Sequence, residues 1–372
     1  MRRTLGVIAV SVVSVLLAGA AVASGATRVV FTVDVESNGT FHLPDQIDAV
    51  CQGGSACGLT AMARLIEKRG WSGTFFLDVY EHRKWGETAM RNIAVDLQTA
   101  GHDVELHTHP QWAYDPARGA MHQYSLDEQT TIIRDGVRLL QTWTGRSVVA
   151  HRAGAYTADE QTLVALERNG VRLDSSLFWK DPDSRLDGLG LPRNLPAWHG
   201  RVAEIPVTVY EREDRSPMFG AALAPVTVLR KIDANWFINE NEVRDAIDAA
   251  VASDIPVLVV FLHSFSFMGA PTGGGPVADQ HAMDMFRAIL DHVARTGLPV
   301  VTMRELAEAR QLPASASGRD IVPHVAVSVD LPHYVWRRAK AAGGIILGFG
   351  VGIPLLAAGA AIGLLRRGRQ GR

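Results

Sequence analysis

This 372-residue chain has only two cysteines and a net charge close to zero. Its 37 lysine and arginine residues nearly balance its 39 aspartate and glutamate residues, which gives a net charge of −2. The basic residues are dispersed apart from a cluster at the C-terminus, so the charge pattern offers nothing to favour nucleic-acid binding. No internal repeat stands out, and the length allows one large α/β domain or two small ones.

The only cysteines are Cys51 and Cys57, six positions apart across a Gln-Gly-Gly-Ser-Ala segment. Two thiols at this spacing either ligate a metal or close a small disulfide loop. Exported proteins rarely keep free thiolates. Because the N-terminus indicates export, the sequence predicts a disulfide between them.

The N-terminus has the composition of a secretory signal. Arg2 and Arg3 precede an apolar run over residues 5–23, and small residues occupy positions 21–26. This order predicts a signal peptide over residues 1–25, with an uncleaved anchor as the alternative. In either case we expect the bulk of the chain to be exported.

The C-terminus carries a second apolar run, residues 343–365, with no charged residue inside it. A helix of about 20 such residues spans a bilayer. The arginine-rich residues 366–372 that follow favour a cytoplasmic end. We therefore expect a domain over residues 27–312 held outside the cytoplasm at the cell membrane, a linker over 313–342, a transmembrane helix and a basic tail. A sorting signal that is later removed is the alternative for the helix.

Between the termini, apolar strands alternate with amphipathic helices. Strands are expected at residues 28–33, 73–79, 101–109, 148–152, 171–174, 204–209, 256–262 and 298–302. Helices are expected at 59–69, 88–100, 126–144, 158–169, 239–252, 279–296 and 304–310. Near-continuous apolar strands alternating with helices indicate a parallel sheet covered by helices. About seven such units predict an α/β fold, a distorted (β/α) barrel.

Polar residues that can do chemistry stand at the ends of these strands. They are Asp34, His107, Arg152, Asp174 and His263. In barrels of this kind the C-terminal strand ends surround one active site. His107 and His109 lie two apart, so in an extended segment they share a face and can hold one metal ion. For these two residues alone, a pair of structural histidines at the edge of the core is the competing interpretation.

In order along the chain, these strand ends resemble the five short motifs of the polysaccharide deacetylase family, also called the NodB homology or carbohydrate esterase 4 group. The corresponding segments are residues 32–36, 101–111, 151–156, 173–176 and 262–263, which span most of residues 28–310. Each motif alone is weak, but five in order at suitable spacing are fairly specific. The resemblance implies a distorted barrel and hydrolysis of an N-acetyl group on a polysaccharide.

The resemblance also implies roles for single residues. Glu36, His107 and His109 become candidate ligands for Zn²⁺ or another divalent metal. Asp34 becomes the base, and Arg152 its ion-pair partner. His263 becomes the acid that protonates the leaving amine, with Asp174 as its orienting partner. The backbone N–H near Tyr156 becomes an oxyanion donor.

Two departures from the family pattern fall at the metal site. Gln111 stands where the family has its second metal histidine, and Val35 replaces the second aspartate of the first motif. The site is therefore either rebuilt around His109 and Glu36 or lost. Two further functions stay open: hydrolysis of another non-peptide C–N bond, and a catalytically inactive protein that binds or assembles an envelope polysaccharide.

Overall fold

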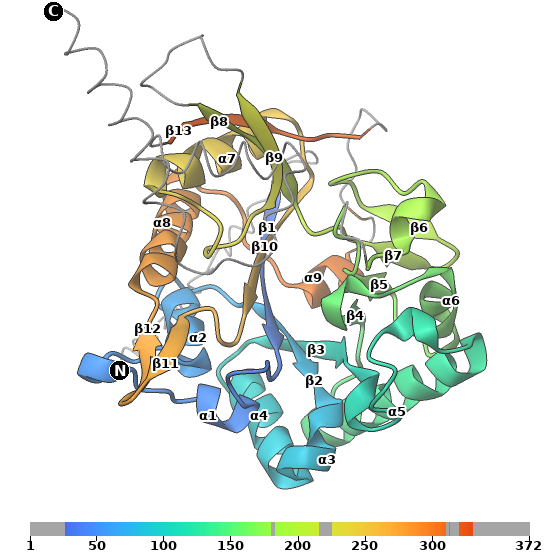
Figure 1. Ribbon diagram of the computed structural model, residues 1–372. Helices are drawn as coiled ribbons and strands as arrows, with labels where there is room; N and C mark the ends of the chain where they lie inside the picture. The colour runs from blue at the N-terminus through green and yellow to red at the C-terminus, as the bar shows by residue number, and fades with distance from the viewer. Residues whose placement is uncertain (1–26, 180–182, 216–224, 310–311, 313–319, 330–372) are drawn as a thin grey trace, which may run out of the picture.

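In the computed structural model, residues 27–179, 183–215, 225–309, 312 and 320–329 are described, and a curled eight-stranded sheet forms their centre (Figure 1). The strand order is β10-β1-β2-β3-β4-β5-β7-β6. Its members are β1 (Arg28–Val35), β2 (Thr74–Asp78), β3 (Asp103–Thr108), β4 (Ala150–Ala153), β5 (Leu173–Asp174), β6 (Ala197–His199), β7 (Val202–Glu204) and β10 (Val257–His263). All pairings are parallel except that of β6 with β7.

The seven parallel strands confirm the predicted α/β class and strand number, but the sheet is a half-barrel. β10 forms one end of the sheet and the antiparallel strand β6 forms the other. The central strands are buried on both faces, which is why they read as continuous apolar runs such as Val29-Val30-Phe31. Their carboxyl ends therefore meet along one edge of the curl.

Helices pack outside the curl, apart from the last one, whose Met303 and Leu306 cluster with the inward-facing Val30 and Val259 (Figure 1). They are α1 (Leu43–Gln46), α2 (Leu59–Glu67), α3 (His82–Trp85), α4 (Glu87–Thr99), α5 (Leu126–Thr144), α6 (Glu160–Arg168), α7 (Glu240–Ala252), α8 (Gln280–Thr296) and α9 (Met303–Glu308). The capping box expected at α5 is present, with Ser125 and Glu128 satisfying each other's backbone N–H groups. Gly145 ends that helix with a left-handed φ of 70°.

Two predicted strands differ from the structure. Residues 204–209 do not form one strand: β7 ends at Glu204, and β8 (Val209–Arg215) begins five residues later in another sheet. Pro206, which has no N–H to donate, lies in the gap. Residues 298–302 make only an isolated bridge between Val300 and Val29, at the start of β1, where pairing with β2 has not yet begun.

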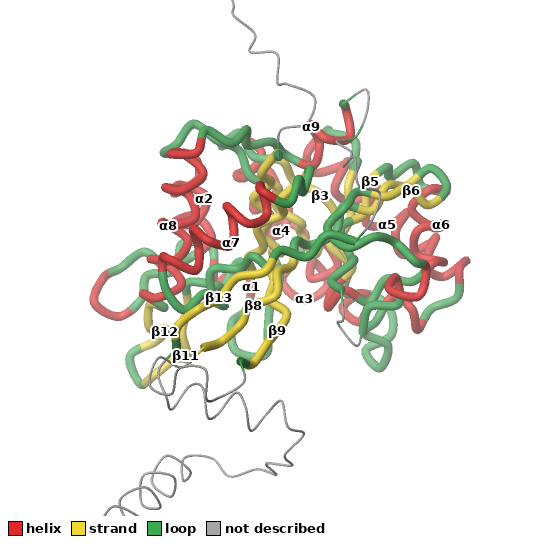
Figure 2. Tube along the Cα trace, turned by 90° about the horizontal axis from the view of Figure 1, so that it is seen from above, coloured by secondary structure: helices red, strands yellow, loops and turns green. Residues whose placement is uncertain are grey.

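A second sheet of three strands was not predicted. β8 pairs with β9 (Val226–Lys231) on one side and with β13 (His324–Ser328) on the other (Figure 2). α7 packs against β13. Residues 324–328 lie within the expected linker, so chain beyond residue 312 also packs on the domain. The other predicted domain boundaries stay predictions.

The expected disulfide between Cys51 and Cys57 is present, beside the hairpin formed by β11 (Met268–Thr272) and β12 (Gly275–Ala278). Gln52 in the disulfide loop donates to Thr272 and to the backbone oxygen of Gly275. The predicted signal peptide and transmembrane helix lie outside the described residues. Among the helices that are described, none is long and apolar enough to cross a membrane.

Candidate metal centre and hydrolytic site

The side chains predicted from the strand ends lie on one edge of the sheet, and most of them meet. Asp34 of β1 is in register with His263 of β10, and His107 of β3 is in register with Arg152 of β4. Glu36 follows β1 directly and reaches the same place. The parallel register thus brings residues more than 200 positions apart into one site.

Glu36, His107 and His109 form the core of the site. Their ligand atoms all lie within 4.8 Å of one another, which places them within reach of a single cation. Oε2 of Glu36 is 3.1 Å from Nε2 of His107 and also contacts Nε2 of His109. Two imidazoles and one carboxylate are a donor set that suits Zn²⁺.

The tautomer of His107 is fixed by its surroundings. Its Nδ1 lies 2.9 Å from the backbone oxygen of Arg152, which can only accept, so Nδ1 carries the proton. Nε2 is then the ring nitrogen that faces Glu36. This is the arrangement in which a second partner orients a metal-binding histidine.

The electrostatics of the cluster also favour a cation. Burial disfavours charge on His107, but the carboxylates of Asp34 and Glu36 raise its pKa above the ordinary value. Burial likewise disfavours charge on His109, but the carboxylate of Glu36 raises the pKa of His109 above the ordinary value. Burial works against ionisation of Glu36, yet the charge of His109 and hydrogen bonds from both histidines hold its pKa well below the usual value. The carboxylates therefore favour positive charge at this point.

Asp34 and Arg152 make the ion pair implied by the family resemblance. The Arg152 side chain is fully buried and donates to Oδ1 of Asp34 at 2.7 Å. It also donates to Thr32 and twice to Ser175, and it lies over the ring of Phe76. The other oxygen of Asp34 is 4.0 Å from Nε2 of His107. Arg152 therefore holds a carboxylate beside the metal cluster in one orientation.

His263 lies beside the other carboxylate oxygen of Glu36, away from His107 and His109. Its Nε2 is 3.6 Å from Oε1 of Glu36, and its ring stacks on Phe265 with centroids 4.6 Å apart. Burial lowers the pKa of His263, with Glu36 opposing the shift. The side chain is 29% exposed, so it lies at the mouth of the site where a substrate can reach it.

Asp174 does not orient His263, which corrects the role implied by the resemblance. Its Oδ1 accepts from Nδ1 of His151 at 2.7 Å and from the Ser176 hydroxyl at 2.8 Å. β5 and β10 are separated by four strands in the half-barrel, which keeps Asp174 away from His263.

Thr108, His151 and Asp174 are instead linked in the manner of a hydroxyl–imidazole–carboxylate triad. The Thr108 hydroxyl lies 3.0 Å from Nε2 of His151. All three residues are fully buried. A nucleophile must meet its substrate, so this chain of hydrogen bonds supports the sheet and does not form a second catalytic site.

Sequence reasoning missed two buried groups at the site. Asp78 ends β2 in register with His107, and its Oδ2 is buried without a hydrogen-bond partner. Lys231 ends β9, donates to the Tyr156 hydroxyl at 3.0 Å and lies 3.6 Å from the centroid of Phe261. The strand-end rule that selected His107 would also have selected Asp78. Lys231 had no such signal, because β9 was not predicted.

The backbone after β4 is strained where the oxyanion donor is expected. Ala155 and Tyr156 adopt left-handed φ angles of 49° and 58° in succession, which non-glycine residues rarely do. Such strain tends to collect at functional sites. Gly154, immediately before, lies against the ring of His109, where an added Cβ would collide with the imidazole.

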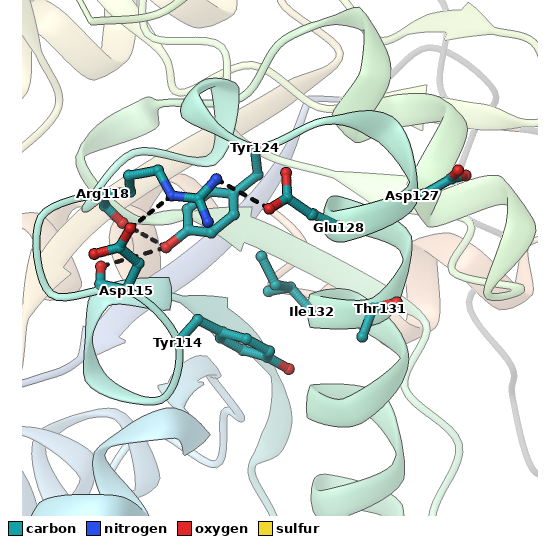
Figure 3. A pocket seen from close by; sticks show the side chains of 8 residues that line it. All are labelled: Tyr114, Asp115, Arg118, Tyr124, Asp127, Glu128, Thr131 and Ile132. Carbon is teal, nitrogen blue, oxygen red and sulfur yellow. Dashed lines mark hydrogen bonds and ion pairs between the residues drawn. The ribbon is translucent and has the colours of Figure 1, made fainter.

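A separate pocket of about 510 Å³ lies beside the segment that follows His109 (Figure 3). Two tyrosine rings line it together with polar side chains that pair among themselves: Arg118 bridges Asp115 and Glu128 at 3.0 Å each and lies over Tyr124. None of the metal-cluster residues lines it. It is therefore distinct from the site at the strand ends.

Comparisons with known proteins point in the direction of the family resemblance. No protein-family model and no curated protein sequence matches the chain. Among solved structures, a Mycobacterium smegmatis protein provisionally named a polysaccharide deacetylase is 19% identical, with a TM-score of 0.48 over 80% of this chain and 96% of that one. A family 4 carbohydrate esterase from Streptomyces lividans, in complex with acetate, is 12% identical with a TM-score of 0.37 over 80% and 98%.

A third similar structure is described as a family 4 pseudoenzyme, from Bacillus anthracis. It is 13% identical, with a TM-score of 0.40 over 82% of this chain and 70% of that one. These structures thus include one described as a family 4 esterase and one described as a family 4 pseudoenzyme. At these identities they are similarities only, and the case for a function rests on the side chains at the strand ends.

Proposed function

We propose that this protein is a divalent-metal-dependent hydrolase that removes N-acetyl groups from a polysaccharide of the cell envelope. One observation carries the proposal: Glu36, His107 and His109 converge beside the Asp34–Arg152 pair, with His263 facing them across Glu36. A cation site, a carboxylate and an imidazole that flank one opening are the groups that amide hydrolysis requires.

Glu36, His107 and His109 would hold the metal, which when bound supplies a Lewis acid for the amide carbonyl. Asp34, oriented by Arg152, accepts the proton of the attacking water. His263, on the other side of Glu36, delivers a proton to the leaving amine nitrogen. The Tyr156 backbone N–H, carried by the strained turn after β4, is the donor proposed for the oxyanion.

We also propose that the domain works outside the cytoplasm, anchored by residues 343–365. The apolar runs at both termini support this, and so does the Cys51–Cys57 disulfide, a feature typical of exported proteins. The envelope polysaccharide is thus the substrate class that the domain would meet.

The test is acetate release from N-acetylglucosamine oligomers by the full-length protein, with Zn²⁺ added and after chelation. We expect zinc-dependent release that Asp34→Asn abolishes and that Asp45→Asn, an exposed aspartate on α1, leaves unchanged. If the protein binds zinc but releases no acetate, it either cleaves another C–N bond or binds polysaccharide without catalysis. Assays with cyclic amides and polysaccharide pull-down separate those two functions.

A further inference from the structure

His109 lacks the support that fixes His107. It follows the end of β3 with φ −117° and ψ 86°, outside the sheet, and a short 3₁₀ turn begins at Pro110. His107 is held by the Arg152 backbone across the sheet. A ligand on an irregular segment needs another partner to aim its ring, since loosely held ligands bind metal weakly.

The side chain of Gln111 contacts that ring. Its amide nitrogen lies 3.3 Å from Nδ1 of His109, while Nε2 of the same ring faces Glu36. Gly154 lies against the ring and leaves space for it because it has no Cβ. Gln111 thus holds the nitrogen of His109 that points away from the cluster.

One buried atom at this contact lacks a hydrogen-bond partner, Oε1 of Gln111, whereas Nε2 of His109 is directed at Oε2 of Glu36. The oxygen and nitrogen of a side-chain amide exchange places by a half-turn. After that turn Oε1 lies at Nδ1 and accepts its proton, and the Nε2 lone pair is free for a cation. The arrangement therefore gives Oε1 a partner and leaves Nε2 directed at the cluster.

We propose that Gln111 is a positioning residue that makes His109 the third metal ligand, by accepting the Nδ1–H of His109 through its side-chain oxygen. At the position where the family has a histidine ligand, this chain has Gln111, which bonds to the ligand and does not itself bind the metal. The ligand is His109, two positions closer to the N-terminus. The inference rests on the metal site of the proposed function.

The test measures Zn²⁺ affinity of the full-length protein by calorimetry, for the wild type, Gln111→Leu and Gln111→Glu. Loss of an outer-shell partner typically costs about 10–100-fold in metal affinity, and we expect that loss for Gln111→Leu. Gln111→Glu keeps an acceptor for Nδ1–H and should stay within about threefold of the wild type. Gln98→Leu, which removes a 3.1 Å amide hydrogen bond to Thr144 on a distant helix, is the matched control and should bind zinc normally.

The visible absorption of bound Co²⁺ gives a second readout, since it reports how many ligands surround the ion. We expect Gln111→Glu to keep the wild-type spectrum and Gln111→Leu to lose intensity. Equal zinc affinity for Gln111→Leu and the wild type, or equal losses for Leu and Glu, would overturn the inference. Zinc binding that follows this pattern without acetate release would instead leave the inference standing and overturn the deacetylase function.

Discussion

His107 donates its Nδ1–H to the backbone oxygen of Arg152 at 2.9 Å, while the side chain of Arg152 pairs with Asp34 at 2.7 Å. One residue thus orients a metal ligand through its main chain and the proposed base through its side chain. The first contact survives any substitution at position 152, and the second does not. Metal binding and catalysis should therefore separate at this residue.

Arg152→Met is expected to keep zinc affinity within about threefold and to abolish acetate release. It also leaves Asp34, which is 4% exposed, without its ion-pair partner. Breaking a buried pair costs about 3–5 kcal/mol of stability. Urea unfolding and zinc calorimetry on the same sample measure both effects. Arg168→Met, which breaks an exposed pair with Asp127, is the control and should change neither. A parallel loss of zinc affinity in Arg152→Met with the fold intact would contradict this division.

Metal removal should destabilise the wild type and leave Glu36→Gln unaffected. A ligand at 100 times its dissociation constant stabilises the folded state by about 2.7 kcal/mol. We therefore expect zinc to raise the melting temperature of the wild type and EDTA to reverse the shift. Glu36→Gln replaces the one carboxylate of the cluster and should show no zinc-dependent shift. Glu67→Gln, whose partner is His102, serves as control and should respond to zinc like the wild type.

Thr108→Val tests whether the buried triad-like chain takes part in catalysis. Valine has a similar shape but cannot donate to Nε2 of His151, and leaving that nitrogen unsatisfied costs about 1–3 kcal/mol. We expect lower stability with acetate release per folded molecule unchanged. Loss of activity comparable to that of Asp34→Asn, in protein shown to be folded by circular dichroism, would make Thr108 part of the catalytic machinery.

Glu204 should give the protein a pH-dependent loss of stability. Burial, together with the charge of Asp174, raises the pKa of Glu204 well above its ordinary value of 4.5. The folded protein then holds a proton that the unfolded chain releases, so this contribution is complete below about pH 4.5 and is lost as pH rises. Glutamine mimics the protonated acid and can keep the Leu177 N–H contact of 2.8 Å.

We therefore expect the stability of Glu204→Gln relative to the wild type to increase from pH 5 to pH 8 in urea unfolding. The exposed Glu308→Gln should follow the wild-type curve at every pH. A difference between Glu204→Gln and the wild type that shrinks as pH rises would show that Glu204 is ionised in the folded protein.

Much of the fold followed from local patterns. The buried strands around Phe31 and Val259 are continuous apolar runs, and the Ser125–Glu128 box marked the start of α5 to the residue. The three-stranded sheet was missed because its strands carry alternating charges, as in Glu211-Arg212-Glu213-Asp214, which resemble an exposed loop. Its buried Arg212 pairs with Asp214 and Glu242, and those partners become visible only when α7 packs there.

The residues that could hold a metal and move protons could be identified from the sequence. They stand at strand ends, and the carboxyl ends of parallel strands meet at one edge of the sheet. The sequence by itself determined six of the seven parallel strands, the disulfide and the composition of the cluster. Only the tertiary structure decided which side chains meet. In the half-barrel Asp174 bonds to His151, and His263 lies beside Glu36. The tertiary structure also placed His109 in the cluster and Gln111 against its ring. The two-residue spacing of His107 and His109 could not predict this, because His109 lies on an irregular segment after β3.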